Sequence, residues 1–129
     1  MFSKTAQYSL RILIFMAKED RTLFSAAYIH EQLDIPYKYL TMLMTKMSKS
    51  GLLNVVRGRN GGFTFERDAK DIVLIDVLDA IGENNYDKCL IRDCACNEED
   101  SCMMHNNWLE PKAKLMEMLT NTSLDTFKL

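Results

Sequence analysis

A glycine-rich run at residues 57–62, Arg-Gly-Arg-Asn-Gly-Gly, limits the possible folds more than any other feature of the sequence. It lies between two short β-prone segments, LLNVV and FTF. Its glycines and asparagine tolerate the positive φ angles that tight hairpin turns require, so a two-stranded hairpin is predicted. Most of the remaining apolar residues recur at three- and four-residue spacings, which indicates helices. The expected fold class is mainly α with a small β-hairpin.

Three helical segments precede the hairpin. They are expected at residues 3–18, 26–33 and 36–50. Ser3 and Ser25 are suited to cap the first two helices, because a serine oxygen can accept a hydrogen bond from the first turn. Pro36 suits the entry to the third helix, where its missing N–H costs nothing and its φ angle is already helical. Gly51 is the expected stop of that helix.

The second half of the chain contains two further helical segments and a polar connection. A fourth helix is expected at residues 71–82, a loop at 83–101, and a short last turn at 122–125. Apolar spacing resumes between Trp108 and Leu119. Pro111 would remove a hydrogen bond from a helix that began near Cys102, so this last helix is expected to start at Leu109 or Glu110.

Three helices followed by a hairpin is the order of a winged helix-turn-helix domain, in which the third helix enters the major groove of DNA. Residues 36–67 carry six basic side chains against one acidic, whereas residues 68–129 carry six against thirteen. This asymmetry suits a protein with one face for double-stranded DNA, although both surfaces could be ordinarily solvated. The expected DNA contacts are Tyr37, Lys38, Thr41, Thr45 and Lys49 on the third helix and Arg57, Arg59 and Asn60 at the hairpin tip.

Four cysteines and one histidine lie close together in the sequence, as Cys89, Cys94, Cys96, Cys102 and His105. No apolar run reaches the length of a membrane span, so a cytoplasmic protein without a membrane partner is expected. A reducing compartment argues against disulfides and for metal or redox chemistry. Thiolates and imidazole suit an iron–sulfur cluster or zinc, and the irregular gaps lack the paired spacing of a zinc ribbon. A metal-free thiol switch, for example Cys94 with Cys96 or Cys102, is the alternative.

The stretches SKTAQYSLRILIFMA, GLLNVVRGRNGGF and CNEEDSCMMHNNW resemble the iron–sulfur-cluster-binding winged-helix transcription regulators of bacteria, the IscR and NsrR type. The resemblance covers essentially the whole chain. It implies that Cys96, Cys102 and His105 hold a cluster, with Cys89 as the first ligand and Cys94 as the alternative in that place. It also implies a 2Fe–2S cluster and a homodimer formed through the helix after the loop, here about Met103 to Leu119.

The resemblance implies a homodimeric DNA-binding transcription regulator, a repressor whose operator affinity senses iron–sulfur status, nitric oxide or redox stress. Residues 1–82 would form the winged-helix domain, 83–102 the cluster-binding loop, and 103–129 the dimerisation helix and tail. A cluster-free thiol-based or cysteine-responsive regulator of the same fold is the second function class. An enzyme or electron carrier is not expected, because the sequence offers no nucleophile–base pair and no phosphate-binding loop.

Overall fold

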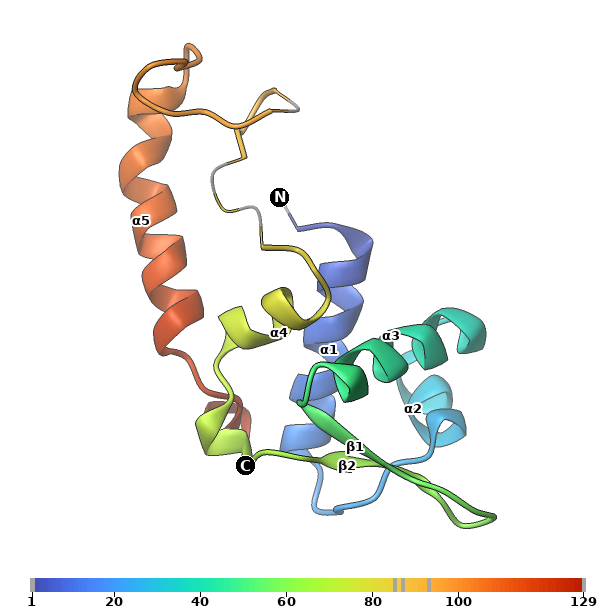
Figure 1. Ribbon diagram of the computed structural model, residues 1–129. Coiled ribbons are helices and arrows are strands. Elements are labelled where there is room, and N and C mark those ends of the chain that lie inside the picture. Colours follow the sequence, from blue (N-terminus) through green and yellow to red (C-terminus); the bar gives the residue numbers. More distant parts are fainter. Residues whose placement is uncertain (1, 85, 87, 93, 129) are drawn as a thin grey trace.

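The computed structural model describes residues 2–84, 86, 88–92 and 94–128, and Figure 1 shows the arrangement of its elements. The elements are α1 (Lys4–Lys18), α2 (Ala26–Leu33), α3 (Tyr37–Lys49), β1 (Leu53–Val56), β2 (Gly62–Phe65), the 3-10 helix η1 (Ala69–Asp71), α4 (Leu74–Ala80), α5 (His105–Asn121) and the 3-10 helix η2 (Leu124–Phe127). The predicted order of three helices and a hairpin is confirmed. The predicted fold class, mainly α with a small hairpin, is also confirmed.

Helix α1 runs through the apolar core and contacts α2, α3, α4 and η2. The Ser3 hydroxyl accepts a hydrogen bond of 3.0 Å from the Ala6 N–H, which caps the helix as predicted. Ile12 and Leu13 are fully buried, and burial of such side chains is the main stabilising contribution to a domain of this size. Helices α3 and α4 both pack on α1. Helix α1 therefore fixes the position of α3 relative to α4, from which the cysteine-containing loop continues.

The hairpin pairs β1 and β2 in antiparallel register, with Leu53 opposite Phe65 and Val56 opposite Gly62. Phe24, just before α2, also joins the hairpin, because its N–H donates to the Phe63 carbonyl (2.9 Å) and its carbonyl accepts from the Phe63 N–H (2.8 Å). A Cβ atom at Gly62 would lie 2.4 Å from the Phe24 carbonyl oxygen, so only glycine fits there. Phe24 thereby fastens β2 close to the turn, and the tip at residues 57–61 projects from the body (Figure 1).

The fourth helix is shorter than predicted. Asp71 belongs to η1, and Ile72 is extended because its carbonyl accepts a hydrogen bond from the Leu124 N–H (2.9 Å). Val73 forms a bridge to Ser123 in the same region. These bonds join η1 and the start of α4 to the end of the chain, which sequence periodicity does not reveal. The short last turn predicted at 122–125 is present as η2, with Ser123 as its N-cap.

The start of the last helix at Leu109 or Glu110, predicted from Pro111, is wrong, and the start near Met103 implied by the resemblance is closer. Helix α5 begins at His105, and Pro111 lies inside it. A proline in this place removes the bond to the carbonyl of Asn107, four residues earlier. Both Asn107 and Pro111 are exposed, so water can hydrate that carbonyl and the helix continues. The cysteine-containing loop lies at the N-terminal end of α5, at the opposite end of the molecule from the hairpin (Figure 1).

In the described residues, no helix combines the length and the apolar character needed to cross a membrane.

Candidate nucleic-acid interface and metal centre

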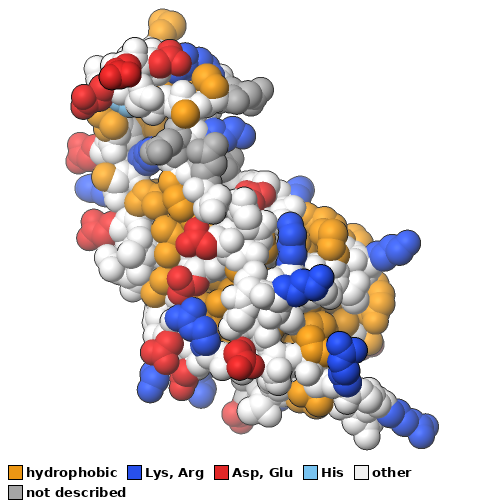
Figure 2. Space-filling view, in the orientation of Figure 1, with side chains coloured by type: hydrophobic (Ala, Val, Ile, Leu, Met, Phe, Trp, Pro, Cys, Tyr) orange, Lys and Arg blue, Asp and Glu red, His pale blue; other side chains and the backbone are white. Residues whose placement is uncertain are grey.

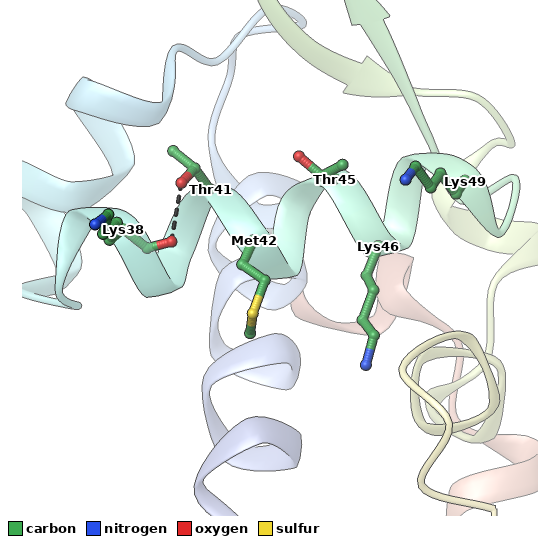
Figure 3. Close-up of a pocket in the computed structure, with 6 residues that line it drawn as sticks. All are labelled: Lys38, Thr41, Met42, Thr45, Lys46 and Lys49. Carbon is green, nitrogen blue, oxygen red and sulfur yellow. Dashed lines mark hydrogen bonds between the residues drawn. The ribbon is translucent and has the colours of Figure 1, made fainter.

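One side of α3 carries the polar residues predicted to contact DNA. Lys38, Thr41, Thr45 and Lys49 line a shallow open hollow on this helix together with Met42 and Lys46 (Figure 3). The opposite side of α3 is buried through Leu40, Leu43, Met44 and Met47. The Thr41 hydroxyl donates to the Lys38 carbonyl (2.9 Å), which leaves its methyl group and oxygen lone pairs at the surface. The hollow therefore offers hydroxyl, ammonium and apolar groups to a ligand lying along the helix.

The N-terminal end of α3 is open to an anion. Pro36 is its N-cap and provides no side-chain hydrogen bond to the first turn. The unbonded N–H groups and the positive end of the helix dipole favour a phosphate at such a place. Tyr37 stands beside it with 51% of its surface exposed, and its ring contacts the ring of His30 edge-on at 5.7 Å. Tyr37 is thus held at the start of the helix and remains accessible to a ligand.

The hairpin tip supplies two more cations. Arg57, Arg59 and Asn60 are all exposed, and Gly58 adopts a φ of 113° that a residue with a side chain rarely takes. A Cβ atom at Gly61 would lie 2.0 Å from the Val56 carbonyl oxygen, so this turn needs glycine twice. Basic side chains project from the hairpin end in Figure 2, whereas the loop end carries a group of acidic ones. The basic side chains at the hairpin end of this face agree with the basic composition of residues 36–67.

None of the cations Lys38, Lys49, Arg57 and Arg59 forms an ion pair with any residue that the structure describes. Unpaired cations on one face can neutralise phosphates without first breaking an internal ion pair. The third helix and the hairpin together therefore form a surface suited to the backbone and grooves of DNA.

The loop brings three thiols together. The Sγ atoms of Cys89, Cys96 and Cys102 all lie within 4.8 Å of one another. Cys89 is buried, and the other two are partly buried. Cys94 is exposed and lies outside this group, although its carbonyl accepts a hydrogen bond from the Cys89 N–H (2.9 Å). Of the two cysteines considered for the first ligand, Cys89 is the one whose thiol lies with the others.

His105 joins the thiol group from the first turn of α5. Its Nδ1 atom lies 3.3 Å from Cys96 Sγ, and its backbone N–H donates to the Cys102 carbonyl (3.1 Å). The Cys102 N–H in turn donates to Cys96 Sγ (3.4 Å). The Nε2 atom of His105 is buried without a partner among the described residues. The imidazole of His105 thus lies against Cys96 at the edge of the thiol group, and neither ring nitrogen belongs to the set of ligand atoms that all lie within 4.8 Å of one another.

Arg92 provides the positive charge of this site. Its guanidinium donates to the Asp100 carboxylate (3.1 Å) and to the Asp100 carbonyl (2.8 Å). Hydrogen bonds to Cys89, Asp100 and Cys96 raise the pKa of Arg92 further above its ordinary value. Burial disfavours the thiolate of Cys89, but hydrogen bonds from Ile91, Arg92 and Cys102 outweigh it and lower the pKa of Cys89 to about 6. Burial and the bond to Cys89 raise the pKa of Cys102.

The thiol group fits a bound metal or cluster by two independent criteria. Three soft sulfur donors with one imidazole are a ligand set that iron–sulfur clusters and zinc both accept. In addition, Arg92 Nε and His105 Nε2 are buried polar atoms without partners among the described residues. Buried polar atoms are nearly always hydrogen-bonded, so partners for these two atoms, such as a ligand or water, are expected from outside the described residues.

Sequence reasoning missed three residues at these sites. Met42 and Lys46 line the same hollow as the predicted residues of α3. Helical periodicity could have indicated them, because Met42 and Lys46 are four residues apart and neither falls on the buried stripe. Arg92 gave no local signal, because its bonds to Asp100 and the two thiols form only when the loop folds.

Comparison with known sequences identifies relatives along the whole chain. A model of the Rrf2 family, described as an iron-dependent transcriptional regulator, matches residues 2–128. A helix-turn-helix transcriptional regulator of Aquifex aeolicus is 28% identical over 127 residues, which cover 96% of this chain and 88% of that protein. The regulator IscR of Photorhabdus laumondii is 32% identical over 98 residues, which cover 75% of this chain and 59% of IscR. The aligned part of the chain thus corresponds to less than two thirds of the length of IscR.

Solved structures agree in fold. CymR, the global cysteine regulator of B. subtilis, has a TM-score of 0.79 at 21% identity and covers 98% of this chain and 95% of CymR. T. potens IscR has a TM-score of 0.71 at 22% identity and covers 98% and 85% of the two chains. The oxidised form of Staphylococcus aureus CymR has a TM-score of 0.72 at 24% identity and covers 97% and 93%. At these identities the similarity establishes a shared winged-helix fold.

Proposed function

The chain belongs to the Rrf2 family and is therefore a DNA-binding transcription regulator and not an enzyme. From this premise we propose that it is a homodimer whose affinity for its operator is controlled by a bound iron–sulfur cluster. The single observation that carries the proposal is the convergence of the Cys89, Cys96 and Cys102 thiols within 4.8 Å. In this proposal residues 1–82 bind DNA, residues 83–102 bind the cluster and residues 103–129 form the dimer.

The DNA contacts in this proposal come from α3 and the hairpin. Tyr37, Lys38 and Thr41 read base edges or phosphates at the start of the helix, while Thr45 and Lys49 continue along the groove. Arg57 and Arg59, with Asn60 between the strands, contact the flanking backbone or minor groove. The exposure of the two arginines supports this assignment, as does their freedom from ion pairs with the described residues.

Cys89, Cys96, Cys102 and His105 would hold the cluster, which we propose to be of the 2Fe–2S type. When bound, such a cluster supplies a group that reacts with oxidants and nitric oxide. The ligands would connect the cluster to two parts of the chain. The three thiols belong to the loop, and His105 belongs to the first turn of α5. A difference of about 1–3 kcal/mol between two dimer geometries is enough to change operator affinity in this way.

The proposed homodimer uses α5. Leu119 is buried against the winged-helix domain, and Leu115 and Met116 are partly buried against the same core. Leu109 and Met118 are about half exposed, at 48% and 46%, so α5 retains apolar surface after it has packed on its own domain. Light scattering with size-exclusion chromatography tests this step, and a monomer at all concentrations would contradict it.

Analysis of iron and acid-labile sulfide in protein purified without oxygen tests the cluster. Near-stoichiometric iron and sulfide with visible charge-transfer bands support the proposal. Stoichiometric zinc without sulfide would instead assign the same four residues to a structural metal site. Colourless, metal-free protein with intact operator binding would favour the second candidate function.

That second candidate is a thiol-based or cysteine-responsive regulator of the same fold. The exposed thiol of Cys94 and the lowered pKa of Cys89 favour it, because a thiolate is the reactive form of cysteine. Operator binding by metal-free protein, abolished by peroxide and restored by a thiol reductant, would support this function.

A further inference from the structure

We propose that Met42 is a specificity-determining residue of the DNA face: its side chain packs on the C5-methyl group of a thymine in the major groove. The operator then carries a thymine at the base pair that faces the middle of α3. This inference rests on the DNA contacts of the proposed function. It adds to them a residue that has no charge and no hydrogen-bond donor on its side chain, and it names the base that this residue selects.

Met42 belongs to the row of side chains that lines the hollow on α3. The row recurs at helical spacing and therefore shares one face of the helix (Figure 3). Its members are Lys38, Thr41, Met42, Thr45, Lys46 and Lys49. The other aliphatic side chains of α3 are fully buried, whereas Met42 is 47% exposed. In this helix, which the structure describes in full, Met42 is thus the one large aliphatic side chain that faces outward.

The neighbours of Met42 leave the middle of the hollow apolar. The Thr41 hydroxyl donates to the Lys38 carbonyl (2.9 Å), so its hydrogen is not offered to a base. The thioether of Met42 has no hydrogen to donate and is a weak acceptor. Lys38 and Lys49 stand at the two ends of the row, where ammonium groups suit phosphates. An apolar centre between cationic ends matches a ligand whose charged backbone flanks an apolar group.

Thymine is the base that supplies such a group. In the major groove, guanine, cytosine and adenine present hydrogen-bonding atoms, whereas thymine presents its C5-methyl group beside the O4 acceptor. The Met42 side chain is unbranched and polarisable, so it can adapt its shape to a methyl group. Burial of one methyl group corresponds to about a fourfold difference in affinity. Met42 therefore favours thymine over a base without the methyl group by about this factor.

Replacement of thymine by deoxyuridine tests the proposal, because it removes the C5-methyl group and keeps every hydrogen-bonding atom. The probe is the duplex that the unmodified protein enriches from a random DNA library, with each thymine replaced in turn. Protein purified without oxygen and the same protein after metal removal are used in parallel. At one position of the duplex the unmodified protein should lose about fourfold in affinity. Met42→Ala should bind the two duplexes equally, and Met42→Leu, which keeps an aliphatic side chain, should retain the preference.

The other thymines of the duplex are internal controls, because their replacement should affect the unmodified protein and Met42→Ala to the same extent. Met42→Gln, with a polar side chain of similar length, is the second variant if Met42→Ala does not fold. Full preference for thymine at every position in Met42→Ala or Met42→Gln would overturn the inference. An unmodified protein that binds the enriched duplex but distinguishes no thymine from deoxyuridine would also overturn the inference alone. Enrichment of no sequence from the library would overturn the proposed function together with it.

Discussion

The Nδ1 atom of His105 lies 3.3 Å from the sulfur of Cys96, and this approach joins the cysteine loop to the first turn of α5. The histidine is the only proposed ligand that belongs to a helix of the structure as described. It therefore connects the metal site to the element that we propose forms the dimer. Its Nε2 atom is buried and has no partner among the described residues.

Replacement of His105 by alanine is expected to shorten the lifetime of the bound cluster while metal-free protein keeps its affinity for DNA. The reason is that three thiols remain but the fourth ligand is gone, and none of the proposed DNA-binding residues belongs to α5. The decay of the visible charge-transfer bands in air measures the lifetime. Asn106→Ala, at the exposed neighbouring position, is the control. An unchanged lifetime in His105→Ala would remove the histidine from the ligand set.

Cys94→Ser and Cys96→Ser form a matched pair, because they make the same chemical change two residues apart. Cys96 lies in the thiol group and Cys94 lies outside it. We expect Cys96→Ser to lose most of its iron and sulfide and Cys94→Ser to retain both. Iron and sulfide analysis of the two purified variants is the measurement. Loss of the cluster from Cys94→Ser with retention in Cys96→Ser would exchange the roles assigned to these cysteines.

Local features predicted most of the fold, and the errors arose where distant segments meet. Ser3 and Ser25 cap their helices through hydrogen bonds to residues three positions away, so sequence alone indicated both. Asp71 falls outside α4 because the backbone of Ile72 pairs with Leu124, more than fifty residues later in the chain. The start of α5 was misplaced because the cost of Pro111 depends on whether water reaches the freed carbonyl, which sequence does not state.

The candidate site was predictable to the same extent. The resemblance indicated Cys96, Cys102 and His105. The structure brings Cys96 and Cys102 together with Cys89 and places His105 against Cys96. The choice between Cys89 and Cys94 needed the fold, because residues 88 and 95 form a bridge that directs the two thiols differently. Arg92 has no sequence signature, since its hydrogen bonds to Asp100 form only when the loop folds.

The pKa of about 6 for Cys89 predicts a pH-dependent absorbance in metal-free protein. A thiolate absorbs ultraviolet light that a thiol does not, and this absorbance should rise through about pH 6 and be missing from Cys89→Ser. The folded-state pKa lies below the ordinary value of 9.0, so the ionised group stabilises the fold above pH 9 and this contribution disappears as the pH falls through 6. The melting temperature of Cys89→Ser should accordingly vary less between about pH 5 and pH 9 than that of the unmodified protein. The raised pKa of Cys102 contributes in the opposite direction in the unmodified protein.

The hairpin tip provides the most direct test of the DNA face. Arg57→Ala and Arg59→Ala should each weaken operator binding and reduce its dependence on salt, by about one unit of slope for each phosphate that is no longer neutralised. Both side chains are exposed and unpaired among the described residues, so their removal should leave the thermal stability within about 0.5 kcal/mol of the unmodified protein. Lys114→Ala, at an exposed position of α5, removes the same charge from an element outside the proposed interface and should change neither quantity. Titrations of a labelled operator at several salt concentrations measure the slope, and variants with the original affinity and slope would show that the hairpin does not touch DNA.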